Sequence, residues 1–317
     1  MRRRIFIVIL AVVGGLLFGA TNQARAEPIV ALTTQNLLIR FDSTTPGVIT
    51  GSPSVTGLQA GESLVGIDFR PANGQLYGLG SNSRLYTINL MTGVATFASA
   101  LSTPLVNATS FGIDFNPVVD RLRVVGSDNR INPAINQNLR IDVDTGMVVV
   151  DGRLTPVMVV SPLDPNIGAA AYSNNFAGAT STTLYDIDFF RDRLVIQNPP
   201  NDGTLVRVGE LSPLMPPMGA DVTNEMVAFD ISGVSGIAYA SLTSPTTNFS
   251  ALYAINLNTG LATLVGPIGS GVTIRGLAAP IGTPVPEPAT MLLLGAGLAG
   301  VAAKVRARRK SCPGEES

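Results

Sequence analysis

The feature that most constrains the fold of this chain is an internal repeat. Residues 85–96 (LYTINLMTGVAT) recur at residues 252–263 (LYAINLNTGLAT), with nine of the twelve positions identical. Weaker copies lie at residues 139–146 and, with one additional turn residue, at residues 38–47. Each copy alternates apolar and polar residues, reaches a Thr-Gly or Pro-Gly turn and then begins a further strand. The repeat therefore predicts an all-β fold assembled from similar units.

A second motif precedes these hairpins. Gly-Ile-Asp-Phe occurs at residues 66–69 and 112–115, Ile-Asp-Phe occurs at 187–189, and Gly-Ile-Ala-Tyr at 236–239 is a degenerate copy. We interpret this motif as the first, innermost strand of each unit. Each unit then contains about four short strands in roughly 40–50 residues, which is typical of a β-propeller blade.

The two ends of the repeat region predict a closed ring. Residues 28–50 supply three strands of a unit but lack the Gly-Ile-Asp-Phe strand, and residues 275–279 follow the last complete unit where a first strand is expected. The C-terminal strand should therefore complete the N-terminal blade, which leaves no open sheet edge. We count five blades, with an insertion around residues 151–180. If residues 170–172 open a unit of their own, the count is six.

The N-terminal 26 residues have the pattern of a secretory signal peptide. Three arginines follow Met1, an apolar run covers residues 5–20, and Ala24 and Ala26 form a small-x-small cleavage site. We expect the cut between Ala26 and Glu27.

The C-terminal region combines three features. Pro286, Glu287 and Pro288 precede an apolar run at residues 289–303, and a basic cluster follows at residues 304–310. The apolar run is shorter than the roughly 17–25 residues of an ordinary membrane-spanning helix. The basic cluster nevertheless favours a span, because positive charge stops and orients a helix at the cytoplasmic side. Small residues within the run match a dinucleotide fingerprint, but a Pro-rich linker precedes them where that motif needs a strand, so we interpret them as close packing of a short membrane helix.

This C-terminal arrangement resembles the PEP-CTERM sorting signal of Gram-negative bacteria over about 25 residues. The resemblance implies recognition by an exosortase, removal of the tail, and delivery to the cell surface or the extracellular polysaccharide matrix. The chain then divides into a signal peptide (1–26), a propeller domain (27–282), a sorting signal (283–310) and a short tail (311–317).

The composition of the body limits its chemistry. Between residues 27 and 285 there are 12 Arg, no Lys and 19 Asp plus Glu, so the net charge is near −7, which argues against nucleic acid or anionic lipid as a partner. The chain has no histidine, and its one cysteine, Cys312, lies in the tail. Ser-His-Asp and Cys-His catalysis and His-ligated metals are therefore excluded. Carboxylate chemistry, hard cations bound by oxygen, or no chemistry remain.

The body also resembles the bacterial family known as domain of unknown function 4394, over most of residues 30–280. The resemblance rests on residues 66–71 (GIDFRP), 85–93 and 174–179 (NNFAGA). It implies an exported, propeller-like domain, and it carries over no activity and no catalytic residues.

The recurring aspartates are the candidate metal ligands. Asp68, Asp114 and Asp188 occupy equivalent positions of the motif, so they could converge around the central channel and bind Ca²⁺. We favour the other interpretation, in which each carboxylate bonds to backbone or pairs with an arginine such as Arg121 or Arg193.

Two further features bear on binding. Asp142 and Asp144 resemble the start of a calcium loop, but the remaining ligands are missing, so a hairpin turn is favoured. The insertion at residues 151–183 is long and polar in its second half, which makes it the expected place for a partner or glycan contact.

These observations predict an exported surface or matrix protein with a non-catalytic binding or structural role. The alternative is a calcium-dependent propeller hydrolase or lyase that acts on polysaccharide or lactone. The expected partners are signal peptidase and exosortase during processing, the membrane through the C-terminal helix before processing, and extracellular polysaccharide or another matrix component. No cofactor is expected, apart from Ca²⁺ in the alternative.

Overall fold

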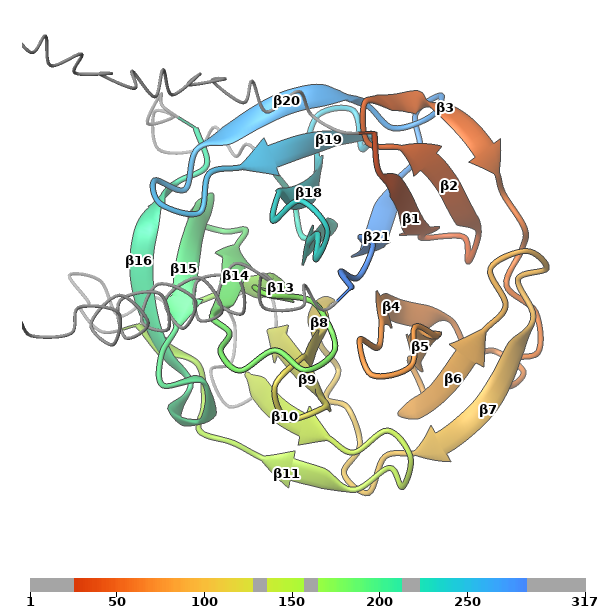
Figure 1. Ribbon diagram of the computed structural model, residues 1–317, viewed down its shortest axis with the longest axis vertical. Helices are drawn as coiled ribbons and strands as arrows, with labels where there is room; N and C mark the ends of the chain where they lie inside the picture. The colour runs from red at the N-terminus through yellow and green to blue at the C-terminus, as the bar shows by residue number, and fades with distance from the viewer. Residues whose placement is uncertain (1–25, 128–135, 157–164, 213–222, 284–317) are drawn as a thin grey trace, which may run out of the picture.

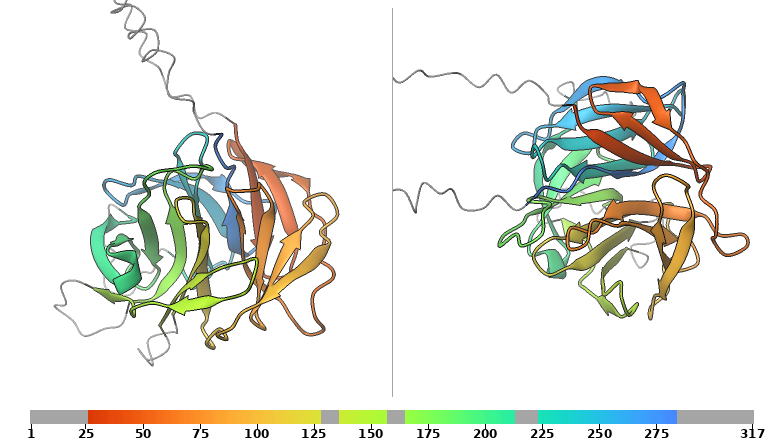
Figure 2. Two further views of the ribbon diagram at one scale, coloured as in Figure 1. Left: turned by 60° about the horizontal axis from the view of Figure 1, so that its bottom comes forward. Right: turned by 45° about the vertical axis from the view of Figure 1, so that its right-hand side comes forward.

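The computed structural model describes residues 26–127, 136–156, 165–212 and 223–283, and they form a five-bladed β-propeller (Figures 1 and 2). Each blade is a sheet whose first strand lies at the centre of the ring and whose last strand lies at the rim. The all-β prediction and the count of five blades are confirmed. Among the described residues, no helix is long and apolar enough to cross a membrane.

In the first three blades the strand named first is the innermost, and the strand named last lies at the rim. Blade 1 contains β21 (Ile274–Ala278), β1 (Pro28–Thr33), β2 (Leu38–Asp42) and β3 (Thr45–Gly51). Blade 2 contains β4 (Leu64–Phe69), β5 (Leu76–Gly80), β6 (Arg84–Ile88) and β7 (Ala95–Ala100). Blade 3 contains β8 (Ser110–Asn116), β9 (Arg121–Ser127), β10 (Gln137–Ile141) and β11 (Val148–Val150).

The remaining two blades follow the same order. Blade 4 contains β13 (Ile167–Tyr172), β14 (Leu184–Asp188), β15 (Arg193–Gln197) and β16 (Thr204–Glu210), and β12 (Thr155–Pro156) pairs with β16 in parallel. Blade 5 contains β17 (Val227–Ile231), β18 (Ala238–Thr243), β19 (Ser250–Ile255) and β20 (Ala262–Pro267). All other strand pairs are antiparallel, as expected for blades built from successive hairpins.

The ring closes as the sequence predicts. β21, from the C-terminal end of the domain, pairs with β1, and Ala278 lies opposite Val30. The buried apolar residues form five clusters, and each cluster fills the space between two neighbouring blades. Burial between blades is therefore the source of hydrophobic stabilisation, since a single four-stranded sheet cannot cover both of its faces.

The structure corrects the strand assignment in blades 4 and 5. Residues 187–189 lie at the end of β14, the second strand of blade 4, and residues 236–239 lead into β18, the second strand of blade 5. The innermost strands are β13 and β17 instead. Residues 170–172 thus belong to an inner strand without adding a sixth blade, and much of the predicted insertion is part of blade 4.

The repeated Thr-Gly turns join the outer hairpins. In blade 2, Oδ1 of Asn89 accepts hydrogen bonds from the amides of Met91 and Thr92, and Gly93 follows with φ of 74°. The same arrangement recurs at Asp142 to Gly146 and at Asn256 to Gly260. The favoured interpretation of residues 142–146 as a hairpin turn is therefore confirmed.

Each of these glycines also lies against the preceding blade. A Cβ at Gly146 would overlap the carbonyl oxygen of Ala100 in blade 2, and the Gly146 carbonyl accepts the amide of Ser102 at 2.9 Å. Gly93 meets Ser54 of blade 1 in the same way. The glycine is thus required twice, by its positive φ and by the close approach of the neighbouring backbone.

We predict that Gly146→Ala destabilises the protein more than Gly61→Ala does. The two glycines have similar φ (74° and 76°), but no atom lies within 4 Å of a Cβ at Gly61. Gly61→Ala should therefore cost only the backbone strain, about 1 kcal/mol. Gly146→Ala should cost about 1–3 kcal/mol more, because the blades must separate. Urea unfolding of the purified protein measures both, and equal losses would contradict the interblade contact.

Candidate functional site: the carboxylate triad of the central channel

Three aspartates from three inner strands converge on the axis of the ring. Asp68 lies near the end of β4, Asp114 near the end of β8, and Asp230 near the end of β17. One carboxylate oxygen of each lies within 4.8 Å of the others, and all three side chains are buried. Blade 5 neighbours neither blade 2 nor blade 3 in the ring. Side chains from these three blades can therefore meet only at the centre. We call Asp68, Asp114 and Asp230 the triad.

Two members of the triad connect neighbouring blades. Oδ2 of Asp68 accepts the amide of Phe115 in blade 3 at 2.7 Å, and Oδ2 of Asp230 accepts the amide of Ala279, directly after β21, at 2.6 Å. The other oxygen of each accepts the amide of the residue that follows it in its own strand. These four N–H donors stabilise negative charge on Asp68 and Asp230.

Asp114 has a different environment. Within the described part of the chain, neither of its oxygens has a partner that meets full hydrogen-bond geometry. The Tyr172 amide and the Asp230 carboxyl are nevertheless close enough to act on its pKa. Asp114 is therefore the carboxyl best suited to keep a proton, and its interaction with Asp230 lowers the pKa of Asp230, as a proton donated from Asp114 would.

The triad as a whole resists ionisation. Burial is the largest cause that raises the pKa of all three carboxyls, and repulsion between the aspartates raises the pKa of Asp68 and Asp114 further. The pKa of Asp230 rises to about 7. Two carboxylates this close cannot readily ionise together, so the triad shares protons unless a cation neutralises it.

The triad offers a partial set of ligands for a hard cation. Ca²⁺ takes six to eight oxygens. Four of the six triad oxygens already accept backbone amides, whereas the two Asp114 oxygens have no partner among the described residues that meets full hydrogen-bond geometry. A cation at this position would therefore rely on Asp114 and on the remaining lone pairs of Asp68 and Asp230.

The structure brings together two of the three aspartates expected at the channel. Asp188 is not in the triad, because it ends β14 rather than an inner strand. It forms an ion pair with Arg191, with Nη1 and Oδ2 2.8 Å apart. The expected arginine partners bind elsewhere, since Arg121 pairs with Asp142 and Arg193 with Glu210.

The sequence interpretation missed Asp230, although a signal for it exists. Each triad aspartate lies nine positions before the residue opposite it on the second strand, which is Tyr77 for Asp68 and Tyr239 for Asp230. Arg123 holds the same place opposite Asp114. The spacing from aspartate to tyrosine would have identified Asp230.

Arg123 organises a second buried polar cluster between blades 3 and 4. Its guanidinium donates to Asp151 at 2.6 Å and Asn138 at 2.7 Å, and also to Tyr172 and Asn201. Asp186 is fully buried nearby, and burial raises its pKa to about 8 while Arg123 opposes the shift. Because Arg123 binds side chains of both blades, we regard its hydrogen bonds as part of the packing between blades, whereas neither oxygen of Asp186 has a hydrogen-bond partner among the described residues.

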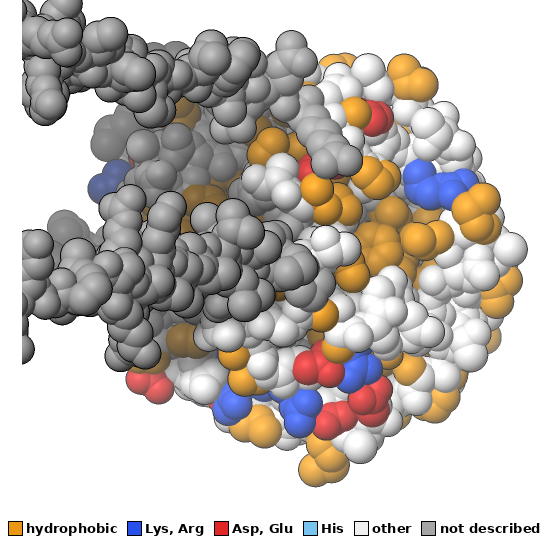
Figure 3. All heavy atoms as spheres, in the orientation of Figure 1, with side chains coloured by type: hydrophobic (Ala, Val, Ile, Leu, Met, Phe, Trp, Pro, Cys, Tyr) orange, Lys and Arg blue, Asp and Glu red, His pale blue; other side chains and the backbone are white. Residues whose placement is uncertain are grey.

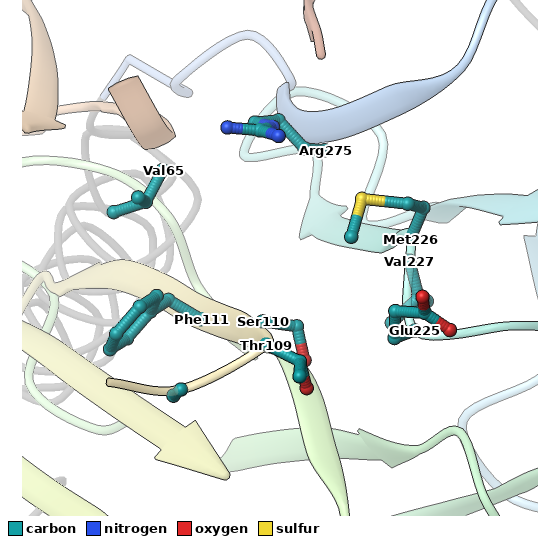
Figure 4. A pocket seen from close by; sticks show the side chains of 9 residues that line it. Val65, Thr109, Ser110, Phe111, Glu225, Met226, Val227 and Arg275 are labelled. Carbon is teal, nitrogen blue, oxygen red and sulfur yellow. The ribbon is translucent and has the colours of Figure 1, made fainter. Parts of the chain in front are cut away.

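Pockets lie on both faces of the ring. One, of about 210 Å³, lies where the inner strands begin and includes Val65, Phe111 and Arg275 (Figure 4). Another, of about 460 Å³, lies at the end where the inner strands finish, between blades 1 and 2, and includes Phe41 and Phe69. Apolar side chains gather in a hollow on this second face (Figure 3).

Several predicted residues lie outside the described part of the chain. They are the signal-cleavage residues Ala24 and Ala26 and the sorting residues Pro286, Glu287 and Pro288. The helices expected at both ends lie outside it as well.

The chain was compared with solved structures. A chain in the crystal structure of a nidogen/laminin complex is 13% identical and gives a TM-score of 0.46, covering 81% of this chain and 99% of that one. A protein from Lactobacillus plantarum is 11% identical with a TM-score of 0.41, over 80% and 99% of the two chains. An auxiliary nutrient binding protein from Bacteroides ovatus is 15% identical with a TM-score of 0.39, over 67% of this chain and 55% of that one.

The search of curated proteins found no match. Two family models match the sequence itself. The PEP-CTERM protein-sorting motif matches residues 284–309, which include the Pro-Glu-Pro box. The model described as domain of unknown function DUF4394 matches residues 37–278, from β2 of blade 1 around the ring to β21. The chain therefore belongs to the DUF4394 family.

Proposed function

We propose that this protein is a non-catalytic binding or structural component of the cell surface or extracellular matrix. Its sorting motif is that of an exported, exosortase-sorted protein of a Gram-negative bacterium. The motif supports a destination outside the inner membrane. The role there has to be argued from the body.

The observation that carries the proposal is the hydrogen bonding of the triad. A catalytic base or metal ligand must keep a lone pair free for its substrate or ion. Each oxygen of Asp68 and Asp230 accepts a backbone amide, one within its own blade and one across to the next, so only the second lone pair of each oxygen is left for a ligand. All three aspartates are at most 1% exposed. This arrangement supports a structural role for the triad at the centre of a rigid scaffold.

One observation favours the alternative, a calcium-dependent hydrolase or lyase acting on polysaccharide or lactone. The Asp114 oxygens have no partner among the described residues that meets full hydrogen-bond geometry, and they lie beside two further carboxylates. In that alternative the cation would bind to Asp114, and the neighbouring carboxylates would complete its coordination. Calcium dependence distinguishes the two functions.

We predict that the stability of the protein falls as pH rises between about pH 5 and pH 7. A triad carboxyl is protonated in the folded protein in this range, whereas in the unfolded chain it ionises near its ordinary pKa of 3.8. Folding therefore takes up protons. The contribution of the triad carboxyl to the free energy of unfolding is complete below its pKa in the unfolded chain, and it is lost as the pH rises through its pKa in the folded protein, which is about 7 for Asp230.

Asp114→Asn isolates this contribution. The amide replaces a protonated acid and can still donate to Asp230, so stability near pH 5 should change little. The slope between pH 5 and pH 7 should become shallower by up to about 1.4 kcal/mol per pH unit. Asp144→Asn is the control, because Arg70 lowers the pKa of this exposed carboxyl and its removal should not flatten the slope. An unchanged slope in Asp114→Asn would contradict proton retention by the triad.

We predict that calcium does not stabilise the protein. Dialysis against EDTA followed by millimolar Ca²⁺ should leave the Tm unchanged, because four triad oxygens each accept a backbone amide and so offer fewer lone pairs than the six to eight oxygen ligands of Ca²⁺ require. In the enzyme alternative, Ca²⁺ at one hundred times its Kd would add about 2.7 kcal/mol. A rise in Tm that disappears in Asp114→Asn would therefore reject the proposed role of the triad and establish the cation site.

The proposed function itself predicts saturable retention on the native matrix. Purified protein should bind to extracellular polysaccharide isolated from the producing cells, and a glycan array should show which sugars it retains. Incubation with the same polysaccharide should leave the length of the polymer unchanged. Shortened chains would support the enzyme, and binding no stronger than that of a bovine serum albumin control would reject the binding role.

A further inference from the structure

The pocket at the start of the inner strands lies on the axis of the ring. Its lining includes Val65 at β4, Ser110 and Phe111 of β8, Val227 of β17 and Arg275 of β21 (Figure 4). Four of the five blades thus contribute to it, so the pocket depends on the closed ring. The triad lies further along the same strands, three residues from Val65 on β4 and three from Val227 on β17.

Arg275 brings a positive charge into this pocket. Its Nη1 donates to the carbonyl oxygen of Leu64 at 3.1 Å, and its buried Nε has no partner among the described residues. Within those residues it forms no ion pair, whereas seven other arginines do: Arg70, Arg121, Arg123, Arg140, Arg191, Arg193 and Arg207. Burial lowers the pKa of Arg275, because its charge loses water without gaining an anion. A desolvated guanidinium facing a cavity is stabilised by an anionic ligand.

The other polar groups restrict what that anion can be. Glu225 lines the same pocket without an ion pair to Arg275, and the buried hydroxyl of Ser110 has no partner among the described residues. A carboxylate and a hydroxyl can accept hydrogen bonds from hydroxyl groups of a ligand. Phosphate monoesters carry close to two negative charges, whereas a carboxylate carries one. Glu225 would therefore repel a phosphate monoester more strongly than a carboxylate.

The apolar residues complete the pocket. Phe111 lies on one side of the pocket, and Met226 and Val227 lie on the opposite side, so apolar surface faces the carbon skeleton of a ligand from two sides (Figure 4). The volume of about 210 Å³ is below the range of about 300–1,000 Å³ for drug-sized ligands, so it suits a single small unit.

We propose that this pocket binds the carboxylate-bearing sugar unit of an acidic polysaccharide, a uronic acid. Arg275 binds the carboxylate, Glu225 and Ser110 bind the sugar hydroxyls, and the apolar side chains on both sides of the pocket contact the ring. This inference rests on the proposed binding function and names the ligand class. It also moves the expected glycan contact from residues 151–183 to the mouth of the channel.

The test uses galacturonate, with galactose as its neutral counterpart. Isothermal titration or ligand-observed NMR should show that the protein binds galacturonate at least tenfold more tightly than galactose. Arg275→Gln keeps a donor for the Leu64 carbonyl but removes the charge, and it should weaken galacturonate binding about tenfold or more. Arg84→Gln is the control, because Arg84 stacks on Phe97 at the rim of blade 2 and should leave binding unchanged.

A second variant guards against misfolding of the first. Val65→Phe reduces the space in the pocket without touching the guanidinium, and it should cause a similar loss of galacturonate binding. Equal binding of galactose and galacturonate, or equal affinity in the wild type and both pocket variants, would overturn the proposal. A series of oligogalacturonates tests whether the pocket recognises a sugar unit within a polymer or a free monosaccharide. Tighter binding of the oligomer supports recognition within a polymer, and a preference for the monomer overturns it.

Failure of this inference is distinguishable from failure of the proposed function. If wild type and Arg275→Gln are retained equally by the native matrix, the pocket is rejected and the binding role stands. If galacturonate binds through Arg275 but the matrix retains neither protein, the pocket stands as a small-molecule site and the matrix role is rejected.

Discussion

The close contact between each outer turn and the preceding blade is the constraint on which the rest of this structure depends. At Gly93 and Gly146 the backbone of one blade approaches that of the next so closely that no side chain fits between them. The contact fixes the spacing of the blades at the rim, and the buried clusters fill the space inside it. Only at this spacing do inner strands from blades 2, 3 and 5 bring their carboxyls within one small sphere.

At the centre of the ring, hydrogen bonds also connect each of two blades to its neighbour. Near the ends of β4 and β17, Asp68 and Asp230 accept the backbone amide of a residue in the next blade. Ala171 and Ala278 occupy the corresponding positions of β13 and β21, directly before the residues whose amides act on Asp114 and Asp230. Three of the five equivalent inner-strand positions thus hold a carboxyl. Two of these carboxyls connect neighbouring blades, and all three lie close enough together to share protons.

The two ends of the channel therefore differ in charge. The end where the inner strands finish holds the buried triad, whose protons keep its charge low. The end where they begin holds the desolvated cation Arg275 beside an open pocket. Because the rest of the body is acidic, an anionic sugar would bind preferentially at the Arg275 end. A binding role is therefore compatible with the structural role of the triad and with the charge of the pocket.

The repeat, the count of five blades, the closure by the last strand and the positions of Asp68 and Asp114 could be predicted from the amino-acid sequence, because they follow from periodicity and from strongly similar copies. That Asp230, and not Asp188, completes the triad became evident only in the folded ring. All strands of a blade alternate between inward-facing and outward-facing side chains with a period of two residues. A local motif therefore does not show which strand of the blade is innermost. That choice depends on contacts between distant segments, such as β13 with β8, and so does the placement of Arg275, which forms no ion pair among the described residues, at the pocket where four inner strands begin.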